Sequence, residues 1–263
     1  PCVLCNTHIK WDALLKRADQ LDCEFIATGH YAQVREENGR YIVSKGVDQS
    51  KDQSYVLWGL SQENLARTIF PLGKMHKKDI RQVALDSGYE AIAKKSESYE
   101  ICFIPDNDYR GFLKRRVKGL EEEVDGGLFV DKEGKILGKR RGYPFYTIGQ
   151  RRGLEIALGE PMYVTGIHPD TNTVTLGLAE DLLKTKMSVR GLNLIKYAEL
   201  PETMEALVKV RYKHPGSKAL MEQRNGDLTV NFYEEVSAIA PGQSAVFYEG
   251  DDVIGGGFIK KDH

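Results

Sequence analysis

The spacing of apolar residues changes along the chain and separates an α/β part from a β part. Over residues 7–22 apolar side chains recur at helical intervals, which predicts an amphipathic helix with Thr7 as its N-cap. A short apolar run at 23–28 predicts a buried strand, and a hairpin turning at Asn38-Gly39 follows. Helical spacing returns over 61–70, 76–87 and 108–117. Helices that alternate with short strands are typical of an α/β layer.

From residue 124 onward, short β-branched and aromatic runs alternate with Gly, Asn and Asp turns. The runs are "GLFVD", "KILG", "PFYTIG", "PMYVTGI", "NTVTLG", "LVKVRY", "DLTVNFY", "SAVFY" and "VIGGGFI". Such regular short strands predict small β barrels or sandwiches. Boundaries in the charge-rich stretch 114–125 and near 186–196 divide the chain into three predicted domains, 1–117, 118–190 and 191–263.

Composition predicts a globular protein of the cytoplasm. Of the 263 residues, 41% are hydrophobic and 29% charged, and no run approaches the roughly 18 apolar residues of a membrane span. Four cysteines are too few for a disulfide scaffold. The net charge of -1 argues against a uniformly basic nucleic-acid binder, but the basic clusters at 114–116, 139–141 and 151–152 permit nucleic acid on one face. Solvated surface charge is the alternative interpretation.

The chain opens with "PCVLCN", in which Cys2 and Cys5 form a C-x-x-C pair. A structural zinc site would need a second such pair or two spaced histidines, and the sequence offers neither. A redox pair is the other self-contained interpretation, because a helix follows directly and a nucleophilic thiolate at Cys5 is physically reasonable. Cys102 in "YEICFIP" suits either a buried strand or the rim of a site, since "KKSESYE" precedes it. Cys23 is expected to be a small buried hydrophobe.

Three further stretches combine residue types that contact nucleotides or RNA. "TGHY" at 28–31 follows the predicted strand, so Gly29 could allow close approach of a nucleotide and His30 could meet a substrate. "KDQSY" at 51–55 offers a cation, an acid and an amide in a row, although a simple turn would look the same. "YTIGQRRGL" at 146–154 interleaves aromatic and basic residues within the β region, which favours RNA over duplex DNA.

Taken together, these motifs resemble the tRNA-specific 2-thiouridylase family. The resemblance covers essentially the whole chain in order and rests on "PCVLCN", "FIATGHYAQV", "KDQSYVLWGLS", "IFPLGK", "EICFIP", "YTIGQRRGL" and "PGQSAVFYEGDDVIGGG". It implies an ATP-dependent sulfurtransferase that converts the wobble uridine of tRNA to 2-thiouridine. It also implies an α/β plus β fold: part of an adenine nucleotide alpha hydrolase-like (PP-loop) α/β domain, a small central β-rich tRNA-binding domain and a C-terminal β-barrel.

The resemblance assigns roles to individual residues of this chain. It implies that Cys102 carries a persulfide, that Cys5 is the second catalytic cysteine and that Gly29 contacts the nucleotide. A larger set matches positions that contact tRNA in the family: Pro1, Cys2, His30, Lys51, Asp52, Gln53, Arg211, Tyr212 and Gln243. The implied partners are tRNA and a protein that donates persulfide sulfur, with Mg-dependent ATP as cosubstrate, no membrane and a monomeric enzyme.

Two departures from the family pattern keep alternatives open. No Ser-Gly-Gly-x-Asp-Ser type phosphate loop is found and the chain starts at Pro1, so we expect a fragment that neither hydrolyses ATP nor thiolates tRNA alone. Cys2 stands where many family members carry Asp, so a [4Fe-4S] cluster on Cys2, Cys5 and Cys102 is a second hypothesis beside the persulfide route. A different PP-loop ATP pyrophosphatase and a non-catalytic tRNA-binding fragment are the competing functions.

Overall fold

The computed structural model describes residues 2–95, 101–104, 106–156, 159–224 and 227–261. Its internal contacts divide the chain into two compact units, each described here by itself. The first unit comprises residues 1–95, 185–234 and 241–263, and the second comprises 96–184 and 235–240. Within the described ranges, no helix is both long enough and apolar enough to cross a membrane.

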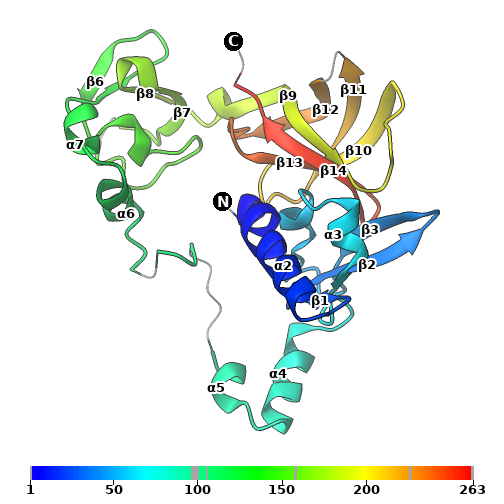
Figure 1. Cartoon of the computed structure of the whole chain (residues 1–263). Helices are drawn as coiled ribbons and strands as arrows, with labels where there is room; N and C mark the ends of the chain where they lie inside the picture. Colours follow the sequence, from blue (N-terminus) through cyan, green and yellow to red (C-terminus); the bar gives the residue numbers. More distant parts are fainter. Residues whose placement is uncertain (1, 96–100, 105, 157–158, 225–226, 262–263) are drawn as a thin grey trace. The chain divides into compact units, whose positions relative to one another are not determined.

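A helical segment opens the first unit (Figure 1). It consists of α1 (Cys2–Leu4), the π-helix η1 (Cys5–Trp11) and α2 (Asp12–Gln20). The helix therefore begins before residue 7, and the predicted N-cap is wrong. The Thr7 hydroxyl donates to the Val3 carbonyl at 3.0 Å, a bond to the preceding turn that a residue inside a helix makes. Cys2 and Cys5 consequently lie within helical turns.

The next elements follow the predicted α/β alternation, with shorter strands. Strand β1 (Ile26–Ala27) pairs in parallel with β4 (Thr68–Ile69). Strands β2 (Ala32–Glu37) and β3 (Arg40–Lys45) form the predicted hairpin, and positive φ angles of 53° at Asn38 and 74° at Gly39 confirm its turn. The remaining helices of this region are η2 (Ser54–Leu57, a 3₁₀ helix), α3 (Gln62–Ala66), α4 (Lys77–Asp86) and α5 (Glu90–Ala93).

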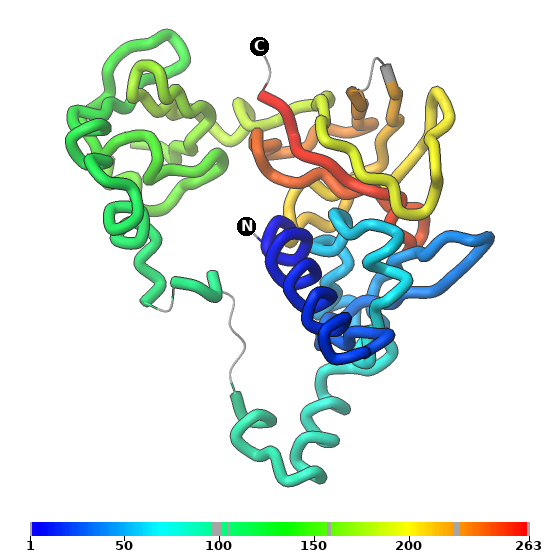
Figure 2. The backbone as a smooth tube through the Cα atoms, in the orientation of Figure 1, coloured from blue at the N-terminus to red at the C-terminus, as the bar shows by residue number. Residues whose placement is uncertain are grey.

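A closed barrel completes the first unit, and Figure 2 follows its path through the yellow to red part of the chain. Among the described residues, six strands close in the order β13-β10-β11-β12-β9-β14, and β14 pairs back to β13. Hairpin β2–β3 extends the sheet from β14. The strands are β9 (Leu183–Leu194), β10 (Thr203–Lys209), β11 (Ser217–Arg224), β12 (Asp227–Ser237), β13 (Ser244–Glu249) and β14 (Asp252–Ile259).

One hydrophobic core holds the helical segment against the barrel. Trp11 of η1 and Leu65 of α3 are fully buried in the same cluster as Val246, Tyr248 and Val253 of the barrel strands. Residues far apart in the sequence therefore depend on one another for burial. This shared core fixes the loops at the end of the barrel relative to the segments that precede β2.

The second unit is a small β domain with two short helices. Its sheet has the order β6-β5-β8-β7, in which β5 and β8 are parallel. Phe129, Val164 and Leu176 form its core with the two helices. The predicted strand at "PFYTIG" is wrong, because Pro144 lies in a 3₁₀ turn and has no amide N–H to donate to a strand partner. The elements are α6 (Tyr109–Arg116), α7 (Leu120–Glu123), β5 (Leu128–Val130), β6 (Ile136–Lys139), η3 (Tyr143–Phe145), β7 (Tyr163–His168), η4 (Pro169–Thr171), β8 (Thr173–Gly177) and η5 (Glu180–Leu182).

Candidate functional site

The helix that carries Cys2 and Cys5 is anchored to the core by one face only. Asn6 is buried and its side-chain amide donates to the Val56 carbonyl at 2.9 Å. The indole of Trp11 is fully buried and donates to the Thr68 hydroxyl at 2.8 Å. Cys2 is exposed and Cys5 half-buried, both as thiols. With this helix held in place, both thiols stay accessible, Cys2 in α1 and Cys5 as the first residue of a π-helical turn. Such turns are often found at functional sites.

The "TGHY" segment packs its histidine against the same helix. The His30 ring lies 5.5 Å from that of Trp11 and 6.1 Å from that of Phe70, and its Nδ1 is 2.9 Å from the Thr28 hydroxyl. Burial, with a smaller repulsion from Lys10, lowers the pKa of His30 to about 4. His30 is therefore neutral at neutral pH, and offers a substrate a hydrogen bond or a ring face but no positive charge.

Gly29, predicted to contact the nucleotide, lies between β1 and His30. A Cβ at this position would meet only a methyl group of Leu72, at 3.7 Å, which is ordinary van der Waals contact. The packing of the described residues therefore does not itself require glycine here. Gly29 is exposed, which is compatible with close approach of a nucleotide, as the sequence predicts.

The "KDQ" turn is bound directly to the "TGHY" segment. The Tyr31 amide donates to the Gln53 side-chain oxygen at 3.0 Å, and the Gln53 amide donates to the Tyr31 carbonyl at 2.8 Å. The Asp52 carboxylate is buried and accepts from the amides of Gly46 and Ser54, at 3.1 and 3.0 Å, and from the Ser54 hydroxyl at 2.9 Å. Its charge is turned inward, so Asp52 shapes the turn.

The barrel loops contribute Arg211, Tyr212 and Gln243 to the same region. The Tyr212 hydroxyl donates to the Asp52 carbonyl at 2.9 Å, and its ring lies 5.9 Å from that of Tyr55. Tyr55 in turn donates to the carbonyl of Ser244, the neighbour of the exposed Gln243, at 2.8 Å. The structure thus brings together residues from three distant parts of the sequence.

Arg211 lies on a turn, although the run "LVKVRY" predicts a strand at this position. Strand β10 ends at Lys209, and the His214 amide donates to the Arg211 carbonyl at 3.0 Å to form a turn. Arg211 and Tyr212 are exposed on this turn. A turn can direct successive side chains outward, whereas a strand would alternate them between two faces.

Two lysines add positive charge near the "KDQ" turn. The ammonium groups of Lys45 and Lys209 lie 5.1 and 5.8 Å from the ring centre of Tyr248. Burial is the main cause of a lowered pKa at Lys209, and Lys45 adds repulsion while Asp52 partly offsets it. Neither Tyr55 nor Tyr248 was predicted as a site residue, because their importance comes from contacts with residues about 160 to 190 positions away.

Cys102 belongs to the second unit and lies in a tight turn. The Ile104 amide donates to the Ile101 carbonyl at 2.9 Å, and Cys102 between them is exposed. The interpretation as a buried strand residue is therefore wrong, and an accessible thiol remains. Cys23, which we expected to be buried, is also exposed, because β1 begins only at Ile26. Pro1 lies outside the described residues.

The loop containing "QRR" is also accessible, but it is not part of the sheet. The Gly149 amide donates to the Val164 carbonyl at 2.8 Å, and the Val164 amide donates to the Gln150 carbonyl at 2.9 Å, so the loop is fastened to β7. Arg151 and Arg152 are exposed, and the Arg151 guanidinium lies 6.0 Å from the ring centre of Tyr163. The second unit thus offers two adjacent arginines beside an aromatic ring.

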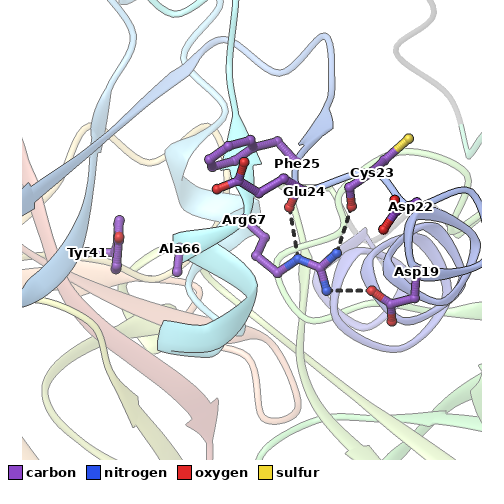
Figure 3. Close-up of a pocket in the computed structure, with 8 residues that line it drawn as sticks. All are labelled: Asp19, Asp22, Cys23, Glu24, Phe25, Tyr41, Ala66 and Arg67. Carbon is purple, nitrogen blue, oxygen red and sulfur yellow. Dashed lines mark hydrogen bonds and ion pairs between the residues drawn. The ribbon is translucent and has the colours of Figure 1, made fainter.

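A pocket of about 490 Å³ opens beside Cys23 (Figure 3), away from every predicted site residue. Three carboxylates line it. Its single cation, Arg67, donates to the carbonyls of Cys23 and Glu24, both at 3.0 Å, and to the Asp19 carboxylate at 2.7 Å. Such a pocket repels phosphate. Its lining residues are Asp19, Asp22, Cys23, Glu24, Phe25, Tyr41, Ala66 and Arg67.

The structure gives no support to the iron-sulfur hypothesis. Across the part of the chain that it describes, no three His, Cys, Asp or Glu side chains lie close enough together to hold a metal ion. Cys2 and Cys5 belong to the first unit and Cys102 to the second.

Three family models match the chain in order. They are the tRNA methyl transferase HUP domain over residues 1–106, the tRNA methyl transferase PRC-barrel domain over 110–178 and the aminomethyltransferase beta-barrel domain over 184–259. These matches, together with the closed barrel, confirm the predicted fold class of an α/β nucleotide-binding region followed by two β-rich regions.

Three tRNA-specific 2-thiouridylases are similar in sequence to this chain over nearly its whole length. The tRNA-specific 2-thiouridylase MnmA of Amoebophilus asiaticus is 61% identical over 261 residues, which are 99% of this chain and 69% of the relative. The protein of the same name from Cytophaga hutchinsonii is 60% identical, over 99% of this chain and 71% of the relative. The protein of the same name from Salinibacter ruber is 58% identical, over 98% of this chain and 68% of the relative.

Proposed function

The chain belongs to the tRNA-specific 2-thiouridylase family of sulfurtransferases, and on this premise we propose that it serves ATP-dependent sulfur transfer to C2 of the wobble uridine of tRNA, through a persulfide on Cys102. The observation that carries the proposal is the 61% identity to a 2-thiouridylase across 99% of the chain. The accessibility of both implied catalytic thiols, Cys5 and Cys102, supports it.

The reaction needs activation of an oxygen that leaves poorly. Adenylation of the uracil O2 by ATP, with Mg, releases pyrophosphate and makes that oxygen part of a good leaving group. The terminal sulfur of the Cys102 persulfide then attacks C2, and AMP departs with the oxygen. This leaves the base joined to Cys102 through two sulfur atoms. The exposed Gly29 is our candidate for the nucleotide contact.

Cys5 completes the transfer in this proposal. Its thiolate attacks the sulfur of Cys102, the bond between the two sulfurs of the intermediate breaks, and the base keeps the outer sulfur as 2-thiouridine. The products are a free tRNA and a Cys5–Cys102 disulfide that must be reduced before the next cycle. A disulfide requires Cα atoms within about 7 Å, so the mechanism requires a state in which the two cysteines meet.

The tRNA surface we propose consists of the residues that meet around the "KDQ" turn. Lys51, Gln53 and Arg211 offer charge and amide groups to the RNA backbone, and Tyr212 and neutral His30 offer rings and hydrogen bonds. Asp52 holds the turn through its buried carboxylate. Gln243 and the unplaced Pro1, with Cys2, complete the proposed set.

We retain the division 1–117, 118–190 and 191–263 as the proposed nucleotide-binding, central tRNA-binding and barrel regions. We also retain a persulfide-donating protein as the proposed sulfur source. A cytoplasmic monomer is the proposed state.

The test is nucleoside analysis of tRNA after incubation with ATP, a persulfide donor and the native protein that carries this chain. We expect 2-thiouridine with the wild type and with Cys23→Ser, a matched change at an exposed thiol outside the site. We expect none with Cys5→Ser or Cys102→Ser. Normal 2-thiouridine formation by Cys102→Ser would contradict the mechanism. AMP release without 2-thiouridine would favour a different pyrophosphatase, and salt-sensitive tRNA binding without turnover would favour a non-catalytic binding role.

A further inference from the structure

We propose that Cys2 is the resolving thiol of the reaction: its thiolate attacks Cys5 in the Cys5–Cys102 disulfide and releases Cys102 for reloading. This inference rests on the proposed function. That function leaves one disulfide for every sulfur transferred and names no group of the protein that reopens it. Cys2, carried over by resemblance only as a contact of the target base, is an accessible thiol three residues from Cys5 that the mechanism has not used.

The helix presents Cys2 and Cys5 on one face. Val3, Asn6 and Trp11 are buried, whereas Cys2 is exposed and Cys5 half-buried, and Ile9, four residues after Cys5, is 64% exposed. Residues three apart on a helix are surface neighbours. Any disulfide partner that reaches Cys5 from solvent therefore arrives beside Cys2.

The distance between the two thiols is suitable for exchange. Helical residues three apart have Cβ atoms about 5–6 Å apart, and a disulfide needs about 3.5–4.5 Å. The difference is about 1 to 2 Å. Cys2 begins α1, and the amides of a first helical turn have no partner within the helix, so this turn can adjust at small cost. The bonds of Asn6 and Trp11 hold the following turns in place during that adjustment.

The exchange is balanced in atoms and electrons. The Cys2 thiolate forms a bond to Cys5 Sγ, the Cys5–Cys102 bond breaks, and Cys102 leaves as a thiolate. Two electrons remain to be supplied, and an external dithiol supplies them by reducing the Cys2–Cys5 disulfide. Cys102 is then free to accept a new persulfide sulfur while Cys2 and Cys5 are still oxidised.

A neighbouring thiol makes this step fast when external reductant is scarce. A group tethered nearby acts at an effective concentration of the order of millimolar, so against about 0.1 mM external dithiol Cys2 accelerates reopening roughly tenfold. The advantage disappears when external dithiol reaches about 10 mM. Dependence on dithiol concentration therefore distinguishes a resolving thiol from a residue that merely supports the fold or contacts the base.

The first experiment detects the disulfide itself. In the native protein with Cys102→Ser, Cys5 has no long-range partner, and oxidation in a glutathione buffer should join it to Cys2. Trypsin cuts after Lys10 and again after Arg17, so the peptide ending at Lys10 holds Cys2 and Cys5 but not Cys23. We expect this peptide to be lighter by two hydrogen atoms and resistant to alkylation. Separate glutathione adducts on Cys2 and Cys5 would overturn the proposal.

The second experiment follows the Cys102 thiol after one round of sulfur transfer, by alkylation and mass spectrometry. With about 0.1 mM dithiol we expect Cys102 of Cys2→Ser to return to its alkylatable form roughly tenfold more slowly than Cys102 of the wild type, with full rescue at about 10 mM. Cys23→Ser should match the wild type throughout. A Cys2→Ser enzyme that is equally fast at low dithiol, or equally slow at high dithiol, would overturn the inference. Failure of the wild type to form any 2-thiouridine would instead remove the proposed function, and the wild-type control reveals that case.

Discussion

Replacing Asp252 by Asn should weaken the attachment of hairpin β2–β3 to the barrel. The Asp252 carboxylate accepts two hydrogen bonds from the Arg35 guanidinium, at 2.8 and 2.9 Å, one from the Ser44 hydroxyl at 2.6 Å and one from the Lys196 ammonium at 2.8 Å. These contacts, led by the Arg35 hydrogen bonds, hold the pKa of Asp252 well below its usual range. An amide at this position offers one acceptor oxygen and no charge.

The expected loss of stability lies between the losses measured for exposed ion pairs and for buried ion pairs. Breaking a buried pair from one side costs roughly 3–5 kcal/mol, and an exposed pair contributes about 0–1 kcal/mol. The Arg35 side chain is 43% exposed, whereas those of Asp252 and Lys196 are 15% and 16% exposed. We therefore expect Asp252→Asn to lower the free energy of unfolding by about 2 kcal/mol at pH 7.

Urea unfolding followed by tryptophan fluorescence measures this loss of stability in the first unit, to which Asp252 belongs. The two tryptophans, Trp11 and Trp58, both lie in the core of the first unit. Asp251→Asn is the matched control, because the Asp251 side chain is 64% exposed and forms an ion pair with Lys45 at the surface, so we expect a change below about 0.5 kcal/mol. Equal losses in the two variants would refute the assignment of the network to Asp252.

The pH dependence provides a second check on the same variant. A carboxyl whose pKa is lower in the folded state than in the unfolded state contributes its full stabilisation of the fold above its ordinary pKa of about 4. This contribution is lost as the pH falls below that value. The difference between wild type and Asp252→Asn should therefore be constant from pH 7 to pH 5 and shrink below about pH 4. A difference that already declined between pH 7 and pH 5 would contradict the depressed pKa.

Two further predictions concern the candidate RNA surfaces. The pKa of His30 is about 4 in the folded state, against an ordinary value of 6.5, so on acidification the unfolded state binds the proton first. Lowering the pH from 7 to 5 should therefore reduce the free energy of unfolding of the wild type by about 2 kcal/mol through this histidine. His30→Gln should remove that component from the tryptophan-monitored unfolding curves, and an unchanged pH slope would contradict it. Replacing Arg151 and Arg152 together by Gln should reduce the salt slope of tRNA binding by about 1.4 to 1.8, measured by titration at several salt concentrations. The control Lys132→Gln with Lys135→Gln removes the same charge from the β5–β6 turn, and an equal effect there would argue against a specific arginine surface.

Local turn chemistry accounts for what the sequence predicted well. Asn38-Gly39 suits a hairpin turn by itself, and the β-branched runs at β8, β12 and β13 indicate strands without any knowledge of their partners. Strand β11 was missed because "SKALMEQR" contains residues that favour helices, and only pairing with β10 and β12 makes it a strand. The secondary structure of residues 217–224 therefore depends on contacts with other strands.

In the candidate site, too, local signals were predicted well and features that depend on tertiary contacts were not. The sequence identified Cys5, Cys102 and the "KDQ" turn as chemically unusual, but it placed Cys2 and Cys5 before the first helix and Cys23 in the core. Both errors concern where an element begins, which depends on tertiary packing: Asn6 and Trp11 extend the helix backward, and β1 is only two residues long. Boundaries of elements are the least certain part of any pattern.

The buried Asp52 carboxylate explains how an acid can stand within a surface proposed to meet phosphate. An exposed carboxylate there would repel RNA, but this one is enclosed by the Gly46 amide and by the amide and hydroxyl of Ser54. With its side chain so used, Asp52 presents its carbonyl to the Tyr212 hydroxyl. The acid therefore aligns the turn with the barrel loop, and burial of its charge leaves the half-buried Lys51 and the exposed Arg211 as the nearby cations. A row of cation, acid and amide in the sequence thus becomes, in the fold, a turn whose acid and amide side chains are hydrogen-bonded to the backbone.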